Sequence, residues 1–196
     1  MHPEIVSIAL FWFVAAYTPG PNNVVASYSG FNFGILKTVP HILGVTLGFT
    51  SLVLFLTIGL INVFKLFPMI QEIMKYLGTL FLIYLAYKIA SSSVSDDTKK
   101  ENQVKFIETF LFQYLNPKGV MVAIIVVSTY VELGENYISH ATQVVFLAFL
   151  FSSTSITLWT FIGKFLRKFA TNEKFIKYFN YAMSCLLLLS IITFYI

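Results

Sequence analysis

Two proline-containing interruptions fall inside long apolar stretches, at corresponding points of the two halves of the chain. They are Pro19-Gly20-Pro21-Asn22-Asn23 and Asn116-Pro117-Lys118. Pro19 and Pro117 lie 98 positions apart (117 − 19), which is half of the 196 residues. A proline removes a helix hydrogen bond, and in lipid the freed backbone groups survive only inside protein or beside a wet cavity. Paired breaks of this kind are typical of transporters built from repeats, with the binding site at the breaks.

The composition indicates a membrane protein. Hydrophobic residues make up 57% of the chain and charged residues 11%, whereas soluble domains contain about 25% charged residues. The net charge of +4 is spread over several loops, without the basic face that nucleic-acid binding needs. The single cysteine, Cys185, permits no internal disulfide and no cysteine-pair chemistry. We therefore expect one integral membrane domain, 1–196, without metal, cofactor or nucleic-acid partner.

Six apolar stretches are long enough to cross a bilayer, which takes about 20 residues. They span roughly residues 5–27, 38–63, 69–90, 106–130, 140–163 and 178–196. A polar connector, 91–105, separates two groups of three. Because three is odd, a repeated unit must enter the membrane from the opposite side the second time. The sequence thus predicts an all-α membrane protein of six transmembrane helices in two inverted three-helix repeats, 1–90 and 106–196. Helices 1 and 4 are expected to be broken near the midplane.

The distribution of lysine and arginine predicts the orientation, since these residues concentrate in cytoplasmic loops. One side receives only Lys65 and Lys75. The other side receives ten cations: Lys37, Lys88, Lys99, Lys100, Lys105, Lys164, Arg167, Lys168, Lys174 and Lys177. Loops 91–105 and 164–177 are therefore predicted to be cytoplasmic, and both termini external.

Lys118 is the main candidate for a functional charge, because it falls near the centre of the stretch 106–130. An ammonium at that depth costs about 2.5–3.5 kcal/mol on insertion scales. We interpret it as a cation in the transport pathway, whose partner is a substrate carboxylate or a free backbone carbonyl at the break. The alternative is a lysine that snorkels from a short or tilted span.

The first break offers a complementary feature. A half-helix begins after it, and the unpaired N–H groups of a helix start favour an anion. Asn22 and Asn23 add side-chain donors and acceptors. We therefore predict substrate binding by Pro19, Gly20, Pro21, Asn22, Asn23, Asn116, Pro117 and Lys118, with a packing kink as the alternative.

Other residues are assigned to packing or to the cavity wall. Gly44 and Gly48 form a small-residue stripe that lets helices approach closely, and Trp159 either packs between helices or borders the cavity. His41 is expected near a span end. The predicted spans hold no carboxylate at depth, so an intramembrane enzyme, which needs a nucleophile and base or paired carboxylates there, is a weak alternative.

The chain resembles the LysE/RhtB family of bacterial amino-acid exporters over essentially its whole length. The resemblance rests on Thr18-Pro19-Gly20-Pro21-Asn22, Gly44-xxx-Gly48, Lys75-Tyr76-Leu77-Gly78, Tyr84-Leu85-Ala86-Tyr87-Lys88, Leu115-Asn116-Pro117-Lys118 and Ser155-xxx-Trp159-xxx-Gly163. It implies a multi-pass secondary transporter of the bacterial plasma membrane that exports amino acids or close derivatives, driven by the proton gradient and without an ATP-binding part.

The neutral-substrate, RhtB-like branch (homoserine, threonine, leucine) is the nearer one. The exporters of lysine and arginine carry acidic residues where this chain reads Gly44-Val45-Thr46-Leu47-Gly48 and Gly119-Val120-Met121-Val122. Export or channelling of another small polar metabolite on the same fold remains an alternative, and assembly into a homo-oligomer stays open.

Overall fold

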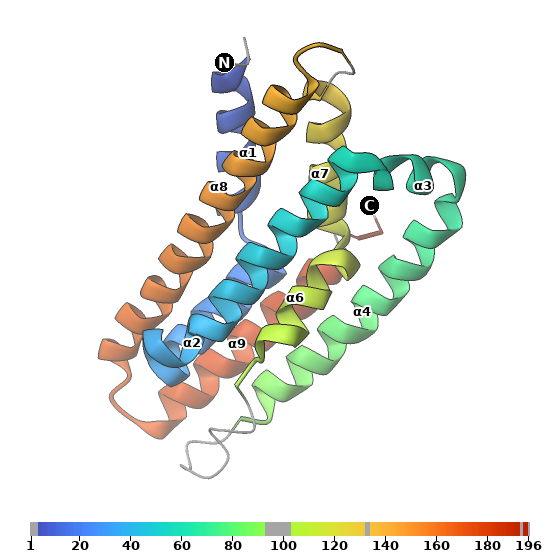
Figure 1. The fold of residues 1–196 in the computed structure, drawn as a ribbon. Helices are drawn as coiled ribbons and strands as arrows, with labels where there is room; N and C mark the ends of the chain where they lie inside the picture. Colours follow the sequence, from blue (N-terminus) through green and yellow to red (C-terminus); the bar gives the residue numbers. More distant parts are fainter. Residues whose placement is uncertain (1–3, 93–102, 132–133, 193, 196) are drawn as a thin grey trace.

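The computed structural model describes residues 4–92, 103–131, 134–192 and 194–195, and within them every regular element is a helix. The elements are α1 (Ile5–Tyr17), α2 (Pro21–Phe55), the π-helical η1 (Leu56–Leu60), α3 (Ile61–Leu66), α4 (Pro68–Ala90), α6 (Phe106–Leu115), α7 (Pro117–Tyr130), α8 (Tyr137–Leu166), the 3-10 helix η2 (Arg167–Phe169) and α9 (Glu173–Ile192). They form an elongated bundle (Figure 1). Most of the predicted connector, including Lys99 and Lys100, lies outside the described residues.

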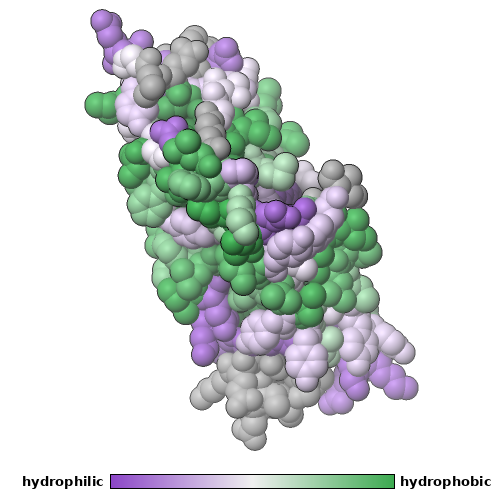
Figure 2. Space-filling view, turned by 90° about the vertical axis from the view of Figure 1, so that its right-hand side faces the viewer, coloured by the Kyte–Doolittle hydropathy of each residue, from purple (hydrophilic) through white to green (hydrophobic). Residues whose placement is uncertain are grey.

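Four helical stretches in the described part are long and apolar enough to cross a membrane: Pro21–Phe64, Pro68–Ala90, Tyr137–Phe169 and Glu173–Ile192. The pair α6–α7, bent by 60°, supplies a fifth if it counts as one broken span. Many large apolar side chains lie on the outer surface, and much of the flank in Figure 2 is apolar. The bundle is therefore a multi-pass membrane protein.

The helix α2 doubles back on itself at Gly34. This residue has φ 78° and ψ 178° inside an otherwise helical run, a left-handed conformation that glycine adopts without steric cost. His41 Nε2 lies 3.3 Å from the carbonyl oxygen of Asn22, although 19 residues of straight helix would separate them by about 28 Å. Residues 21–33 and 35–55 are thus two antiparallel arms, visible as a hairpin in Figure 1.

A long unbroken helix, α8, supports the first break. It runs parallel to α1 and the first arm of α2, since contacts pair Phe13 with Phe151 and residues later in each helix meet further along. Ser155 Oγ donates to the Ala16 carbonyl (2.8 Å) and Ser27 Oγ donates to the Trp159 carbonyl (3.1 Å). A Cβ on Gly163 would lie only 2.0 Å from the Ser27 carbonyl oxygen. Small residues let these backbones touch, as is common between membrane helices.

The helices α4 and α9 form a second antiparallel pair, joined by hydrogen bonds inside the bundle. Ser184 Oγ donates to the Ala86 carbonyl (2.8 Å), and Asn180 Nδ2 donates to Ser92 Oγ (2.9 Å). Asn32 Nδ2 in the first arm of α2 donates to Asn180 Oδ1 (2.7 Å). Polar side chains that would be costly in lipid therefore satisfy one another.

Some predicted span limits are wrong. The stretch predicted to end at residue 27 continues as helix to the Gly34 turn, and α9 begins at Glu173 rather than at 178. Hydropathy underestimates the lengths of both helices, because polar residues such as Asn32 and Asn180 hydrogen-bond within the bundle and do not end the helix.

Candidate functional site

Each break ends one helix and starts another with a proline at its first position. Pro21 is the first residue of α2 and Pro117 the first of α7, where the missing N–H costs nothing and the fixed φ suits a helix start. The structural counterpart of Pro117 is thus Pro21, and not Pro19 as the 98-residue spacing implied. Pro19 belongs to the extended link after α1.

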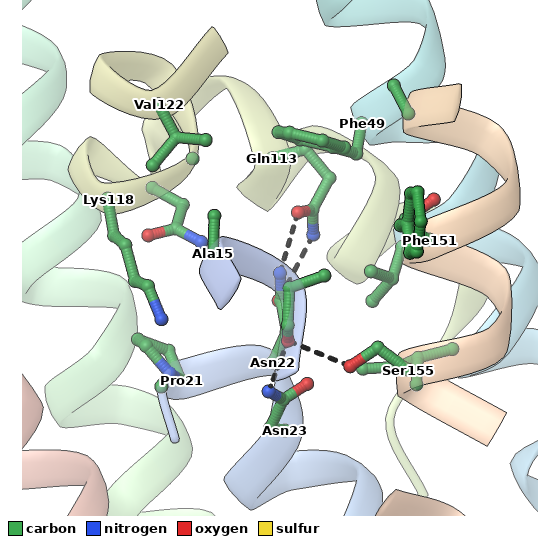
Figure 3. Close-up of a pocket in the computed structure, with 18 of the residues that line it drawn as sticks. Ala15, Pro21, Asn22, Asn23, Phe49, Gln113, Lys118, Val122, Phe151 and Ser155 are labelled. Atoms are coloured by element: carbon green, nitrogen blue, oxygen red, sulfur yellow. Dashed lines mark hydrogen bonds between the residues drawn. The ribbon is translucent and has the colours of Figure 1, made fainter. Parts of the chain in front are cut away.

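The two breaks border one cavity of about 80 Å³. Figure 3 shows side chains from α1, α2, α6, α7 and α8 converging on it. Its polar lining comes from Asn22, Asn23, Gln113, Asn116, Lys118, Ser152 and Ser155, and its apolar lining includes Trp12, Val45, Phe49, Val122, Phe151 and Ile156. A small compartment with one polar end and aromatic walls can enclose a small amphipathic solute.

Lys118 reaches across from α7 to the end of α1. Its Nζ donates to the carbonyl of Thr18 (3.2 Å) and lies 3.5 Å from that of Pro19. A cation near the last carbonyls of a helix is favourable, so the lysine stabilises the interrupted end of α1. Gly20 leaves room for it, since a Cβ there would lie 3.1 Å from Nζ. The sequence analysis considered two partners for Lys118, a substrate carboxylate and free backbone carbonyls. In the structure, Lys118 binds backbone carbonyls.

Asn23 shares this task. Its Nδ2 donates to the carbonyls of Ala16 (2.9 Å) and Thr18 (3.0 Å). The open carbonyls at the end of α1 therefore have side-chain donors from both breaks, as a helix end without access to water requires.

The N–H groups that start α2 and α7 face a different situation. The N-cap residue of α2 is Gly20, which has no side chain to offer. The N-cap residue of α7 is Asn116, and its side chain makes no cap hydrogen bond, although asparagine is among the best capping residues. The residues that follow the two prolines are Asn22 and Asn23 in α2, and Lys118 and Gly119 in α7. All four line the cavity, so both helix starts border it, and helix starts are favourable places for an anion.

An amide pair that the sequence analysis missed joins the two breaks. Asn22 Nδ2 donates to Gln113 Oε1 (2.8 Å) and Gln113 Nε2 donates to Asn22 Oδ1 (3.2 Å), as the dashed lines in Figure 3 show. Gln113 also donates to the Thr109 carbonyl (2.7 Å) and is fully buried. A polar residue one helical turn before Asn116, in an apolar stretch, is the signal that could have identified it.

Two cavity-lining residues contain buried polar atoms without a partner. Among the described residues, Asn116 Oδ1 and Trp12 Nε1 make no hydrogen bond, and both residues line the cavity. They are 3% and 1% exposed. An unmade hydrogen bond of a buried group costs about 1–3 kcal/mol, so an acceptor and a donor are available beside the cavity for a ligand to satisfy.

The remaining predicted residues lie around the cavity rather than in its wall. Pro19 and Pro117 do not line it. Gly44 and Gly48 contact α6, where a Cβ would lie 2.0 Å from Thr109 Oγ1 and 2.7 Å from the Phe110 carbonyl oxygen respectively. Trp159 packs beside the small cluster around Ile156 and is absent from the cavity lining.

His41 was expected near a span end, and it lies seven residues after the Gly34 turn, but its side chain also reaches the first break. The ring is buried and donates from Nε2 to the Asn22 carbonyl at 3.3 Å. The Gly34 turn brings the second arm of α2 back along the first, so a residue close to the turn in sequence lies against the break. Hydropathy alone does not give the position of that turn.

Comparisons with known proteins identify relatives over most of the chain. The family model described as LysE type translocator matches residues 13–195. The chain is 26% identical to the cysteine/O-acetylserine efflux protein of Salmonella choleraesuis (strain SC-B67) over 171 residues, covering 86% of this chain and 87% of the relative. It is also 26% identical to the protein of the same name in Escherichia coli (strain K12) over 172 residues, with the same coverage. No solved structure matches it significantly.

Proposed function

Because the chain belongs to the LysE type translocator family, a family of transporters rather than enzymes, we propose that it exports small neutral amino acids or close derivatives from the cytoplasm. The observation that carries this proposal is the meeting of two helix starts, one lysine and one unpaired asparagine oxygen around a single cavity. Each of these groups has a counterpart in an amino acid.

The polar end of the cavity suits the α-amino and carboxylate groups. The carboxylate binds the first-turn N–H groups of α2 and α7 and the ammonium of Lys118, which gives up its carbonyl partners. The substrate ammonium binds Asn116 Oδ1 and the carbonyls that Lys118 releases. Trp12 Nε1 adds a donor. The exchange keeps each buried polar group paired, which is the condition for polar chemistry in a membrane.

The rest of the lining supports a neutral side chain. No aspartate or glutamate is among the cavity residues of the described chain, so a cationic side chain would lack a countercharge. The volume of about 80 Å³ favours small solutes. The relatives are named for export of cysteine and O-acetylserine, both small and uncharged in the side chain. Homoserine, threonine and leucine form the wider candidate set.

We further propose six spans in two inverted three-helix repeats. The Gly34 turn divides α2, and residues 21–33 then pair with α1 as a broken span, as α7 pairs with α6. Each 13-residue half, 5–17 and 21–33, is about 20 Å long, so together they exceed the bilayer core of about 30 Å. The second arm of α2 then corresponds to α8, and α4 to α9.

The proposed orientation keeps the Gly34 turn, the end of α4 and the α8–α9 connection in the cytoplasm, where the cations gather. These features share one end of the bundle, and the start of α1, the end of α7 and the start of α8 lie at the other (Figure 1). Protons entering down their gradient are the proposed driving ions.

The direct test is counterflow into liposomes that contain purified protein and an excess of one unlabelled amino acid. We expect uptake of labelled cysteine, O-acetylserine, homoserine, threonine or leucine, and none of lysine or arginine. A collapsed proton gradient should slow net export but leave counterflow intact. If no amino acid exchanges while another small polar metabolite does, the alternative cargo is correct.

A further inference from the structure

A second, larger hollow lies on the other side of the α6–α7 break. It measures about 420 Å³ and is formed by the first turns of α4, the break itself and the end of the chain at Phe194 and Tyr195. Figure 2 shows a hydrophilic patch set in a hollow of the largely apolar flank. Polar groups on a membrane-facing flank are costly and mark functional sites by default.

The α6–α7 break is the wall between the two spaces. Asn116 and Lys118 line the small cavity, whereas their neighbours Leu115 and Pro117 line the hollow. One turn further along α7, Val122 lines the cavity and Met121 the hollow. The backbone at Asn116 is extended (φ −83°, ψ 100°) and the helices on its two sides meet at 60°, so the two spaces are separated by an interrupted helical segment.

The hollow offers one charge of each sign. Glu72 and Lys75 lie three residues apart on α4, on the same helix face, and both line the hollow. Lys75 Nζ lies 4.1 Å from the centroid of the Tyr195 ring. Neither belongs to the ion pair found among the described residues, which joins Lys88 and Glu108 at 3.7 Å. A separated cation and anion beside apolar walls complement a zwitterion.

We propose that this hollow is a release site for zwitterionic amino acids, which leave the small cavity past the α6–α7 break. The carboxylate passes from Lys118 to Lys75, and the ammonium from Asn116 to Glu72. The site lies at the start of α4, on the half of the bundle opposite the cytoplasmic connector. This inference rests on the proposed function, since it assigns a second station to the same substrate.

The test uses accessibility in full-length protein with Cys185 replaced by serine. Met121 is 59% exposed and lines the hollow, whereas Ile125, one turn along the same helix, is 47% exposed and does not line it. Single variants Met121→Cys and Ile125→Cys are reconstituted and labelled with a small maleimide. We expect transported amino acid to slow labelling of position 121 at least threefold and to leave position 125 unchanged.

Transport provides a second, independent measurement. Met121→Trp should fill the hollow and lower counterflow at least fivefold, Ile125→Trp should not, and Lys75→Met should raise the half-saturating external amino-acid concentration. Unchanged labelling of position 121 by substrate overturns the release site, as does wild-type counterflow by Met121→Trp. If labelling of position 121 is slower in phosphatidylethanolamine vesicles than in phosphatidylcholine vesicles, whether or not amino acid is present, the hollow binds a lipid headgroup. That result also overturns the release site. Failure of the proposed function differs from all of these, because the wild-type protein would then exchange no amino acid.

Discussion

Two glycine-to-alanine substitutions in the same bundle should differ in their effect on stability, one lowering it and the other not. A Cβ on Gly163 would lie 2.0, 2.7 and 2.8 Å from three backbone atoms of Ser27, where ordinary contact begins at 3.4 Å. Backbone atoms cannot rotate away, so α8 and the first arm of α2 must separate. Overpacking costs about 1–3 kcal/mol, and three backbone clashes place Gly163→Ala at the upper end. The higher helix propensity of alanine relative to glycine offsets about 1 kcal/mol of this cost.

The net loss for Gly163→Ala is therefore about 2 kcal/mol, or a fall in Tm of about 4–8 °C for a chain of this size. Gly119 is the matched control. Its Cβ would meet only Phe49 and Asn116 side-chain atoms, at 3.5 Å or more, so Gly119→Ala should keep or raise the Tm by up to about 4 °C. Because the new methyl group enters the small cavity, that variant should also export more slowly.

The assay is thermal unfolding of both purified variants in the same detergent, followed by counterflow. Equal Tm changes for the two substitutions would refute the close α8–α2 contact. A stable Gly119→Ala that exports at the wild-type rate would show that this part of the cavity does not enclose substrate.

Further predictions concern topology and the amide pair between the breaks. In a Cys185→Ser background, Thr171→Cys should react with an impermeant maleimide only from the cytoplasm and Asn136→Cys only from outside; the reverse pattern would invert the bundle. Asn22→Leu leaves the buried Gln113 amide partly unpaired and should cost about 1–3 kcal/mol, measured as a lower Tm. Adding Gln113→Leu should recover much of the Tm but not transport, and recovery of counterflow would mean that the pair serves stability alone.

The sequence predicted the helical membrane class and the positions of both breaks, because proline in an apolar stretch has few structural solutions. It predicted a connection between residues 27 and 38, but not that the turn would be confined to Gly34. Apolar residues continue on both sides of Gly34, and a hairpin between two membrane helices can form within a single residue that tolerates positive φ. The contact of His41 with the first break and the longer first span both follow from that turn.

The sequence singled out Asn22, Asn116 and Lys118 at the breaks, and the structure brings these three residues to one cavity; their role in binding stays a prediction. The roles were less predictable. Lys118 and Asn23 bind the end of α1, and Gln113, from a helix that looks ordinary in sequence, joins the breaks. Contacts between distant segments decide these roles, and the sequence marks Gln113 only as a polar residue in an apolar stretch.

The central claim is that the Lys118 ammonium binds the substrate carboxylate where the two breaks meet. Lys118→Met removes a charge that costs about 2.5–3.5 kcal/mol to insert at the bilayer centre and loses charged hydrogen bonds worth about 1.5–3 kcal/mol, so its Tm should stay close to that of the wild-type protein. Lys37→Met, at an exposed position on α2, is the matched control.

The decisive measurement is counterflow of a labelled amino acid by these two variants at equal reconstituted amounts. We predict that Lys118→Met loses at least nine-tenths of the exchange rate while Lys37→Met retains it, and that Lys118→Arg is also impaired because a planar guanidinium differs in shape and hydrogen bonding. Exchange by Lys118→Met at the wild-type rate would contradict the assignment and reduce the lysine to a stabiliser of the end of α1.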